Sequence, residues 1–143
     1  MIVINRKTCY TCGMSGDEAM KKPDCCGHSG SDHYFGYDKI VNLTPHPIIL
    51  EGIGVIPSDG VLRVTTEKKV VKTLAGIDVV ETTFGEITGY NLPMEDNCGF
   101  VHYIVSLPCA QALKGLRTDI FITDNPIRDE KGTIIGCKGL GRI

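Results

Sequence analysis

Six side chains that bind soft metal ions lie within the first quarter of the sequence. They are Cys9, Cys12, Cys25, Cys26, His28 and His33. Four of them follow the spacing Cys-x2-Cys-x12-Cys-x2-His, which allows two short knuckles to close a tetrahedron around zinc. We therefore expect a structural zinc site made by Cys9, Cys12, Cys25 and His28. Four protein ligands leave no open position for water or substrate, so the pattern predicts a metal site and not a reaction.

Two further ligands make the choice of the zinc set ambiguous. Cys26 can replace Cys25 and His33 can replace His28, and the sequence does not decide between these sets. A redox pair at Cys9 and Cys12 is the second interpretation, but such a pair needs a cysteine at a helix N-terminus, which the neighbouring residues do not indicate. Free thiols in a disordered segment are the third.

A second group of polar residues lies in the run Asn42-Leu43-Thr44-Pro45-His46-Pro47. The two prolines favour extended backbone before them and remove two backbone donors, which is typical of an edge strand or a pocket rim. Side chains alternate along a strand, so we expect Asn42, Thr44 and His46 in one row on one face. Such a row can form a ligand-binding wall, or its members can satisfy one another or a turn.

Ser106 and Arg117 form the third candidate group. Ser106-Leu107-Pro108 reads as the start of a helix, where unpaired amides and partial positive charge favour an anion. Arg117 can add a bidentate fork for phosphate or carboxylate. The alternative is an ordinary helix cap and an Arg117–Asp119 pair. We group Ser106 and Arg117 with Asn42, Thr44 and His46 as the candidate ligand pocket.

No catalytic residue is assigned, and we favour a protein that is not an enzyme. Histidines and cysteines that can be combined as base and nucleophile are far apart in the sequence, which does not indicate that they meet. A small hydrolase with His46 as base and Asp119 as its orienting group is retained as a third option.

The elements that must position these residues divide the chain in two. Residues 6–38 contain few aliphatic side chains, whereas residues 39–143 are rich in Val, Ile and Leu. A segment so poor in apolar surface cannot offset its backbone entropy by burial, and metal ligation supplies the missing free energy. We therefore expect a metal-binding segment, residues 1–38, and a β-rich globular domain, residues 39–143.

The larger part consists of short β-branched runs separated by turn residues, with turns expected at Ala75-Gly76 and at Asp129-Glu130-Lys131-Gly132. The expected strands cover residues 39–50, 61–66, 70–72, 77–83, 86–88, 100–105, 119–123 and 133–138, with a helix from residue 106 to residue 114. This pattern predicts an α+β fold, mainly antiparallel, in a curled sheet or partly open barrel with one short helix. The zinc segment is expected as an N-terminal knuckle.

Charge and composition exclude several classes of partner. The net charge is −2 and the Lys and Arg residues are dispersed, so a nucleic-acid partner is not expected. The apolar run in residues 1–5 is too short for a signal peptide or a membrane span, so we expect a cytoplasmic protein without a membrane partner. The seven cysteines then read as thiols and metal ligands. A homo-oligomer stays open.

Several stretches of residues 39–143 resemble a family of small uncharacterised bacterial and phage proteins. They are Asn42-Leu43-Thr44-Pro45-His46, residues 79–89, Tyr103-Ile104-Val105-Ser106, Arg117-Thr118-Asp119 and residues 128–136. The resemblance carries no established reaction. The segment before Lys39 departs from the shorter members and has the character of an added module.

The resemblance implies a phage or bacterial setting, with the bacterial host cytosol as the location if the chain is phage-encoded. In that setting the first hypothesis is a zinc-stapled protein that binds a small phosphate-bearing molecule, such as a nucleotide signal that a phage gains by sequestering. The alternative is an interaction module that docks a protein or nucleic acid through the zinc segment. The hydrolase that uses His46 ranks third.

Overall fold

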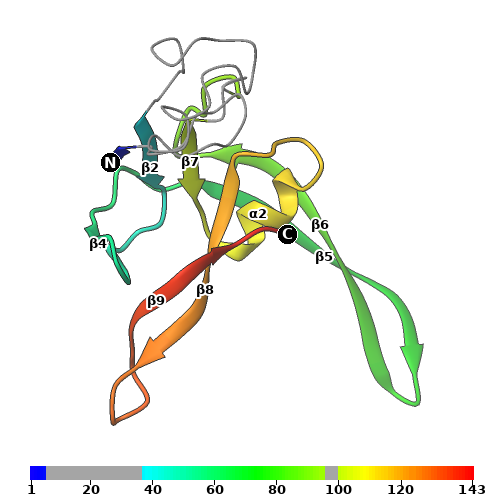
Figure 1. Ribbon diagram of the computed structural model, residues 1–143. Helices are drawn as coiled ribbons and strands as arrows, with labels where there is room; N and C mark the ends of the chain where they lie inside the picture. The colour runs from blue at the N-terminus through cyan, green and yellow to red at the C-terminus, as the bar shows by residue number, and fades with distance from the viewer. Residues whose placement is uncertain (6–36, 96–99) are drawn as a thin grey trace, which may run out of the picture.

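The residues that the structure describes are mostly β, with one short helix (Figure 1). The computed structural model describes residues 1–5, 37–95 and 100–143; all six candidate zinc ligands lie outside these residues, and so does the expected knuckle. Seven of the described strands form one sheet. In spatial order they are β1 (Ile2–Asn5), β2 (Tyr37–Asn42), β7 (Val101–Ile104), β8 (Ile120–Arg128), β9 (Ile134–Gly141), β3 (Ile48–Leu50) and β4 (Gly54–Ile56).

The seven-stranded sheet is mixed, whereas the sequence predicted a mainly antiparallel one. Strand β7 pairs parallel with both β2 and β8, and β3 pairs parallel with β9. The other three pairings in this sheet are antiparallel. The parallel pairs arise because the chain crosses over before it returns: a helix connects β7 to β8, and a long excursion separates β2 from β7.

The sheet curls until its last strand returns to its second. Asn42 at the end of β2 forms a parallel bridge with Ser58, just after β4. The amide of Asp59 donates to the Asn42 carbonyl at 2.8 Å, and the amide of Leu62 donates to the Leu43 carbonyl at 3.0 Å. The curled sheet is therefore nearly closed, which agrees with the curled sheet or partly open barrel expected from the sequence.

The carboxyl-terminal halves of β2 and β7 are buried on both faces. Ile40 and Ile104 point into one core cluster, which also contains Leu50, Ile56 and Cys137. Val41 and Tyr103, their neighbours along the chain, point into a second cluster beneath the helix, with Leu43, Leu62, Val105, Cys109, Ala110, Leu113 and Ile120. Because side chains alternate along a strand, a pair of central parallel strands can serve two cores at once.

Helix α2 (Leu107–Leu113) covers the second cluster and confirms the expected helix. Ser106 is its N-cap residue, but the Ser106 side chain makes no capping hydrogen bond, contrary to expectation. One physical reason is that Pro108 occupies the second helical position, where it removes one of the two amides that an N-cap hydroxyl normally binds. The helix ends before Gly115, whose φ is +77°.

The two remaining strands form a long ribbon that projects from the body of the molecule (Figure 1). Strand β5 (Arg63–Leu74) pairs antiparallel with β6 (Ile77–Thr88). Ala75 and Gly76 connect them with φ values of 48° and 81°. Positive φ at both positions is the geometry of a two-residue hairpin turn whose twist matches that of the strands, so the hairpin expected there is confirmed.

Two other expectations about the strands were wrong. The strand expected over residues 39–50 is broken, since β2 ends at Asn42 and β3 begins at Ile48. Strand β1 was not expected; it pairs with β2 and so places Ile2–Asn5 in the main sheet. Among the described residues, no helix has the length and apolar character needed to cross a membrane.

Candidate ligand-binding site

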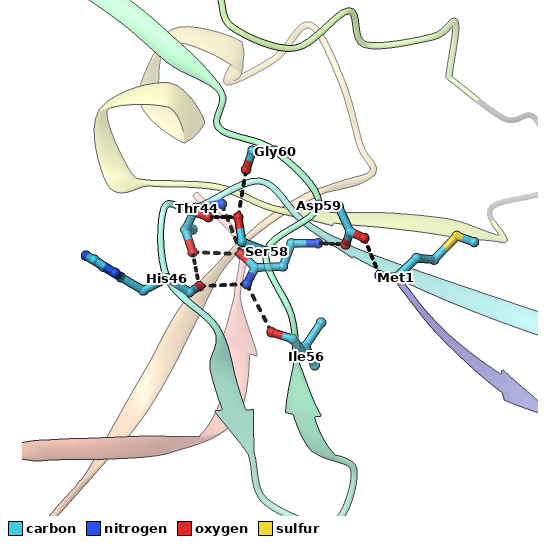
Figure 2. A network of polar contacts seen from close by, with 8 residues as sticks. Met1, Thr44, His46, Ile56, Ser58, Asp59 and Gly60 are labelled. Atoms are coloured by element: carbon cyan, nitrogen blue, oxygen red, sulfur yellow. Dashed lines mark hydrogen bonds and ion pairs between the residues drawn. The ribbon is translucent and has the colours of Figure 1, made fainter.

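Asn42 is buried at the end of β2 and lies at the centre of a polar network. Figure 2 labels its partners in this network, among them Thr44, His46 and Ile56. Its Nδ2 donates to the carbonyl oxygen of His46 at 2.8 Å and to that of Ile56 at 3.2 Å. Its Oδ1 accepts from the Thr44 amide at 2.9 Å and from Thr44 Oγ1 at 2.7 Å. These contacts use both donors and both acceptor positions of the carboxamide.

The segment that follows β4 closes this network from the other side. Asp59 Oδ2 accepts from the Asn42 amide at 3.0 Å, and the same carboxylate forms an ion pair with the Met1 ammonium group. Ser58 Oγ donates to the carbonyl of Thr44 at 2.6 Å. The network therefore joins the end of β2, the bend after it and the exit from β4.

The bend formed by residues 43–47 replaces the row of side chains that the sequence predicted. Asn42 binds the amide of Thr44 and the carbonyl of His46, which curls the backbone back on itself and ends the strand. Asn42 and Thr44 satisfy each other, which is the alternative that the sequence left open. The His46 ring is exposed and points away from the network (Figure 2).

His46 and Pro47 form one side of a cavity of about 610 Å³. The cavity is lined by the β3–β4 hairpin on one side and by β8 and β9 on the other. Its lining residues are His46, Pro47, Ile48, Ile49, Val55, Thr123, Asp124, Pro126, Ile134, Ile135, Gly136 and Cys137. We call it the His46 cavity. Most of the wall is apolar; among the described lining residues, His46, Thr123 and Asp124 contribute the polar side chains.

The shape of the His46 cavity depends on a close approach of β9 to β3. A Cβ atom on Gly136 would lie 2.9 Å from the carbonyl oxygen of Ile49, so a larger residue there pushes the two strands apart. Next to it, Cys137 is buried and its Sγ lies 3.7 Å from the same carbonyl. Burial raises the pKa of the Cys137 thiol, which keeps it protonated and unsuited to act as a nucleophile at neutral pH.

Arg117 is engaged by Asp119 and not by an open pocket. Its Nε and Nη2 donate to the two carboxylate oxygens of Asp119 at 2.8 and 2.6 Å, and its Nη1 donates to the Pro93 carbonyl at 2.6 Å. Its guanidinium also lies over the Tyr103 ring, 5.7 Å from the centroid. The hydrogen bond to Asp119 raises the pKa of Arg117, in accord with its role as the counter-charge of a buried carboxylate.

The five residues grouped as the ligand pocket do not line one common cavity. Arg117 lines a second cavity of about 200 Å³, together with Lys114, Thr118 and Arg142 among others. Ser106 lies at the start of α2 and Arg117 beyond its end, so the helix itself separates them. Asn42 and Thr44 act on the His46 cavity indirectly, because their network fixes the bend that carries His46.

The hydrolase arrangement is not assembled either, since the Asp119 carboxylate binds Arg117 and not His46. His102, the other histidine among the described residues, lies with its Nε2 3.1 Å from Asp38 Oδ1. Its ring meets Phe121 edge to face, at 5.6 Å between centroids. This pair lies between neighbouring strands of the sheet and lines none of the cavities described above.

Most of the wall of the His46 cavity was missed by sequence reasoning. The available signal was the pair of adjacent isoleucines at 48–49 and again at 134–135, since neighbouring strand residues point to opposite faces. The members of such a pair cannot both face the same core. Ile49, Ile134 and Ile135 are 48%, 56% and 49% exposed, and all three line the cavity.

Comparison with known proteins assigns no function to this geometry. Comparisons of the chain with protein-family models, with curated proteins and with solved structures find no match.

Proposed function

We propose that this chain is a small-molecule-binding protein and that its ligand occupies the His46 cavity. The observation that carries the proposal is an apolar cavity of about 610 Å³ with three polar side chains at its wall. Small-molecule sites in proteins are typically concave, of roughly 300–1,000 Å³, mostly apolar and equipped with a few polar groups that orient the ligand.

The wall chemistry favours an apolar compound with a hydrogen-bond donor or a cationic group. Asp124 supplies a carboxylate, Thr123 a hydroxyl and His46 an imidazole, while no lysine or arginine among the described residues lines the cavity. A phosphate bound there would meet no cationic side chain of the described wall residues, so nothing would offset the free-energy cost of removing it from water. We therefore revise the ligand class from a phosphate-bearing molecule to an apolar one.

A phosphate-bearing or nucleotide ligand remains a separate hypothesis tied to the smaller cavity beside Arg117. Lys114, Arg117 and Arg142 line that cavity, but Asp119 already holds the Arg117 guanidinium. Glu95 accepts from the Thr118 amide at 2.9 Å at the same place. An incoming phosphate therefore competes with two carboxylates of the protein itself.

The same proposal includes structural zinc in the N-terminal segment, bound by the cysteine and histidine set named above. It also includes a cytoplasmic location and a phage or bacterial setting. An interaction module is the second candidate function. The sequence placed its docking surface in the zinc segment, whereas the long exposed β5–β6 ribbon favours docking through the β domain, because such a surface fits a macromolecule better than a small ligand.

The test uses the purified full chain and a neutral apolar probe, Nile red. Val55→Arg, at an exposed residue of the cavity wall, should weaken Nile red binding at least about ten-fold, since a charged side chain then fills the apolar space. Val71→Arg is the matched control: Val71 is 50% exposed but lies on the ribbon, and its variant should bind like the unmodified chain.

A second arm of the experiment looks for the natural ligand and for phosphate recognition. Denaturing the freshly purified chain and analysing the extract by mass spectrometry should release an apolar compound that Val55→Arg fails to retain. ATP and inorganic phosphate should leave the melting temperature unchanged. Equal Nile red affinity in all variants, with no retained compound, overturns the proposal, and stabilisation by phosphate moves the site to the Arg117 cavity.

A further inference from the structure

The β5–β6 ribbon leaves a large apolar surface uncovered. Between Thr65 and Glu86 every side chain except that of Val79 is exposed. Those of Val70, Leu74, Ile77, Val80 and Phe84 are between 37% and 70% exposed. Neither strand pairs with any third strand of the described residues. A two-stranded ribbon is only marginally stable in water without further strands or a packed face, so we expect another chain to bind here.

The two edges of the ribbon differ in how they are protected. Strand β5 carries Lys68, Lys69 and Lys72, and its register with β6 shifts between Val70 and Lys72, where Val71 is inserted as a bulge. Lysines and bulges are the usual devices that prevent an edge strand from pairing with another chain. The β5 edge is thus closed to further pairing.

The β6 edge lacks these devices. From Ile77 to Phe84 the strand has no inserted residue, no lysine, no arginine and no proline, and five of its eight residues are Ile, Val or Thr at positions 77, 79, 80, 82 and 83. Such a strand has high β propensity and a free row of backbone donors and acceptors. It is the edge to which a further strand can add.

We propose that β6 of one molecule pairs antiparallel with β6 of a second copy of this chain. The product is a four-stranded ribbon in the order β5, β6, β6 of the second copy and β5 of the second copy. A two-fold axis relates the copies, so the same edge is used on both sides and the assembly closes at a dimer. Its outer edges are then the two lysine-bearing β5 strands, which stop further growth.

The side chains select a register with the two-fold axis at Val80. Val70 and Val80 face each other within one ribbon, so this axis creates a row of four valines across the dimer. Residues directly opposite across antiparallel strands share a face, and β-branched pairs there are stabilising. Glu81 lies opposite Lys69 of its own ribbon and meets Val79 of the second copy.

Charge also favours this register over its neighbours. With the axis at Val80, Thr82 meets Asp78 of the second copy, and no two like charges lie directly opposite. With the axis at Glu81, two carboxylates face each other at the centre of the dimer, which is destabilising. Pairing over seven residues is small compared with an ordinary interface of about 1,600 Å², so we expect the dimer to dissociate on dilution.

The proposed register predicts that opposite charges at position 82 change the dimer dissociation constant in opposite directions. Thr82 lies opposite Lys68 in its own ribbon, so Thr82→Glu is compatible with the hairpin but faces Asp78 of the second copy twice per dimer. Thr82→Glu should weaken dimerisation about ten-fold, and Thr82→Lys should strengthen it by a similar factor. Both effects should shrink at high salt, because these charges are exposed.

Sedimentation velocity of the full chain between about 5 and about 500 µM measures the dimer dissociation constant directly. Thr66→Glu places the same charge on β5 and should leave that constant unchanged. A chain that is monomeric over the whole range, as expected if its own residues 6–36 or a different protein cover the edge, overturns the proposal. Equal dissociation constants for Thr82→Glu and Thr82→Lys do so as well.

Discussion

The Arg117 guanidinium binds both carboxylate oxygens of Asp119, with Nε 2.8 Å from Oδ1 and Nη2 2.6 Å from Oδ2. The Asp119 side chain is 5% exposed and that of Arg117 13%. A carboxylate this buried needs a charged, hydrogen-bonded partner. The pair therefore explains the Arg-Thr-Asp run of the sequence as a structural feature, without a ligand.

The first prediction concerns this pair. Arg117→Ala should lower the free energy of unfolding by about 3 kcal/mol, because it leaves the Asp119 carboxylate buried and uncompensated. Urea denaturation measures the loss. The double variant Arg117→Met with Asp119→Leu should recover most of it, since an apolar pair of similar volume needs no counter-charge. A stable Arg117→Ala that has lost affinity for phosphate would instead identify Arg117 as a ligand-binding residue.

The second prediction concerns the network at the end of β2. Asn42→Ala should cost about 3 kcal/mol of unfolding free energy, because the buried Ile56 carbonyl, the His46 carbonyl and the Thr44 amide lose their shared partner. It should also weaken Nile red binding, since the bend that carries His46 is no longer fixed. Urea denaturation and a dye titration measure the two effects.

Ser58→Ala is the control for the Asn42 network. It removes an exposed hydroxyl that contacts the Thr44 and Gly60 carbonyls and should cost less than about 1 kcal/mol, with little effect on the dye. Equal losses in the two variants contradict the central role of Asn42.

The third prediction is a pH dependence that comes from Cys137. Burial raises the pKa of its thiol above the ordinary value of 9.0, so the folded chain holds this proton more tightly than the unfolded chain does. The resulting stabilisation is complete below pH 9.0 and is lost as the pH rises through the folded-state pKa. Urea midpoints measured between pH 8 and 10.5 should fall more steeply for the unmodified chain than for Cys137→Ala.

The comparison in that experiment is between slopes, since Cys137→Ala also leaves a small void that lowers stability at every pH. Parallel curves for the two proteins contradict a buried, proton-retaining thiol at this position.

The fourth prediction concerns the N-terminal metal site. Elemental analysis of the freshly purified chain should find about one equivalent of zinc, the stoichiometry of a four-ligand site. Cys9→Ser and Cys12→Ser should each abolish retention of the metal through dialysis. If Cys25 and His28 complete the ligand set, the Cys26→Ser and His33→Ala variants should retain the metal. Loss of the metal in these two variants would instead assign Cys26 and His33 as the ligands.

Local signals in the sequence were sufficient for the elements that local chemistry determines. The Ala75-Gly76 turn, helix α2 after Ser106 and the turn at Asp129-Glu130-Lys131-Gly132 are all where the sequence predicted them. In each case a residue with restricted or unusual backbone freedom, Gly or Pro, lies at the decisive position.

The pairing of distant strands and the cavity were not accessible in the same way. Period two placed Asn42, Thr44 and His46 in one row, but the Thr44 amide donates a hydrogen bond to the Asn42 side chain, and the strand ends there. The His46 cavity joins β3 and β9, whose residues are far apart in the sequence. Nothing in the spacing of Ile49 and Gly136 indicates that they touch.

The parallel pairing of β3 with β9 has a consequence for folding during synthesis. Leu50 has its partner at Cys137, so β3 and the Ile40 face of β2 emerge from the ribosome long before the strand that completes their core. The β5–β6 ribbon, by contrast, can form as soon as its own turn is made. Nascent chains should therefore carry an early hairpin beside an incomplete curled sheet, whose apolar edge stays exposed until the last strand is synthesised. A chaperone is needed most during this period.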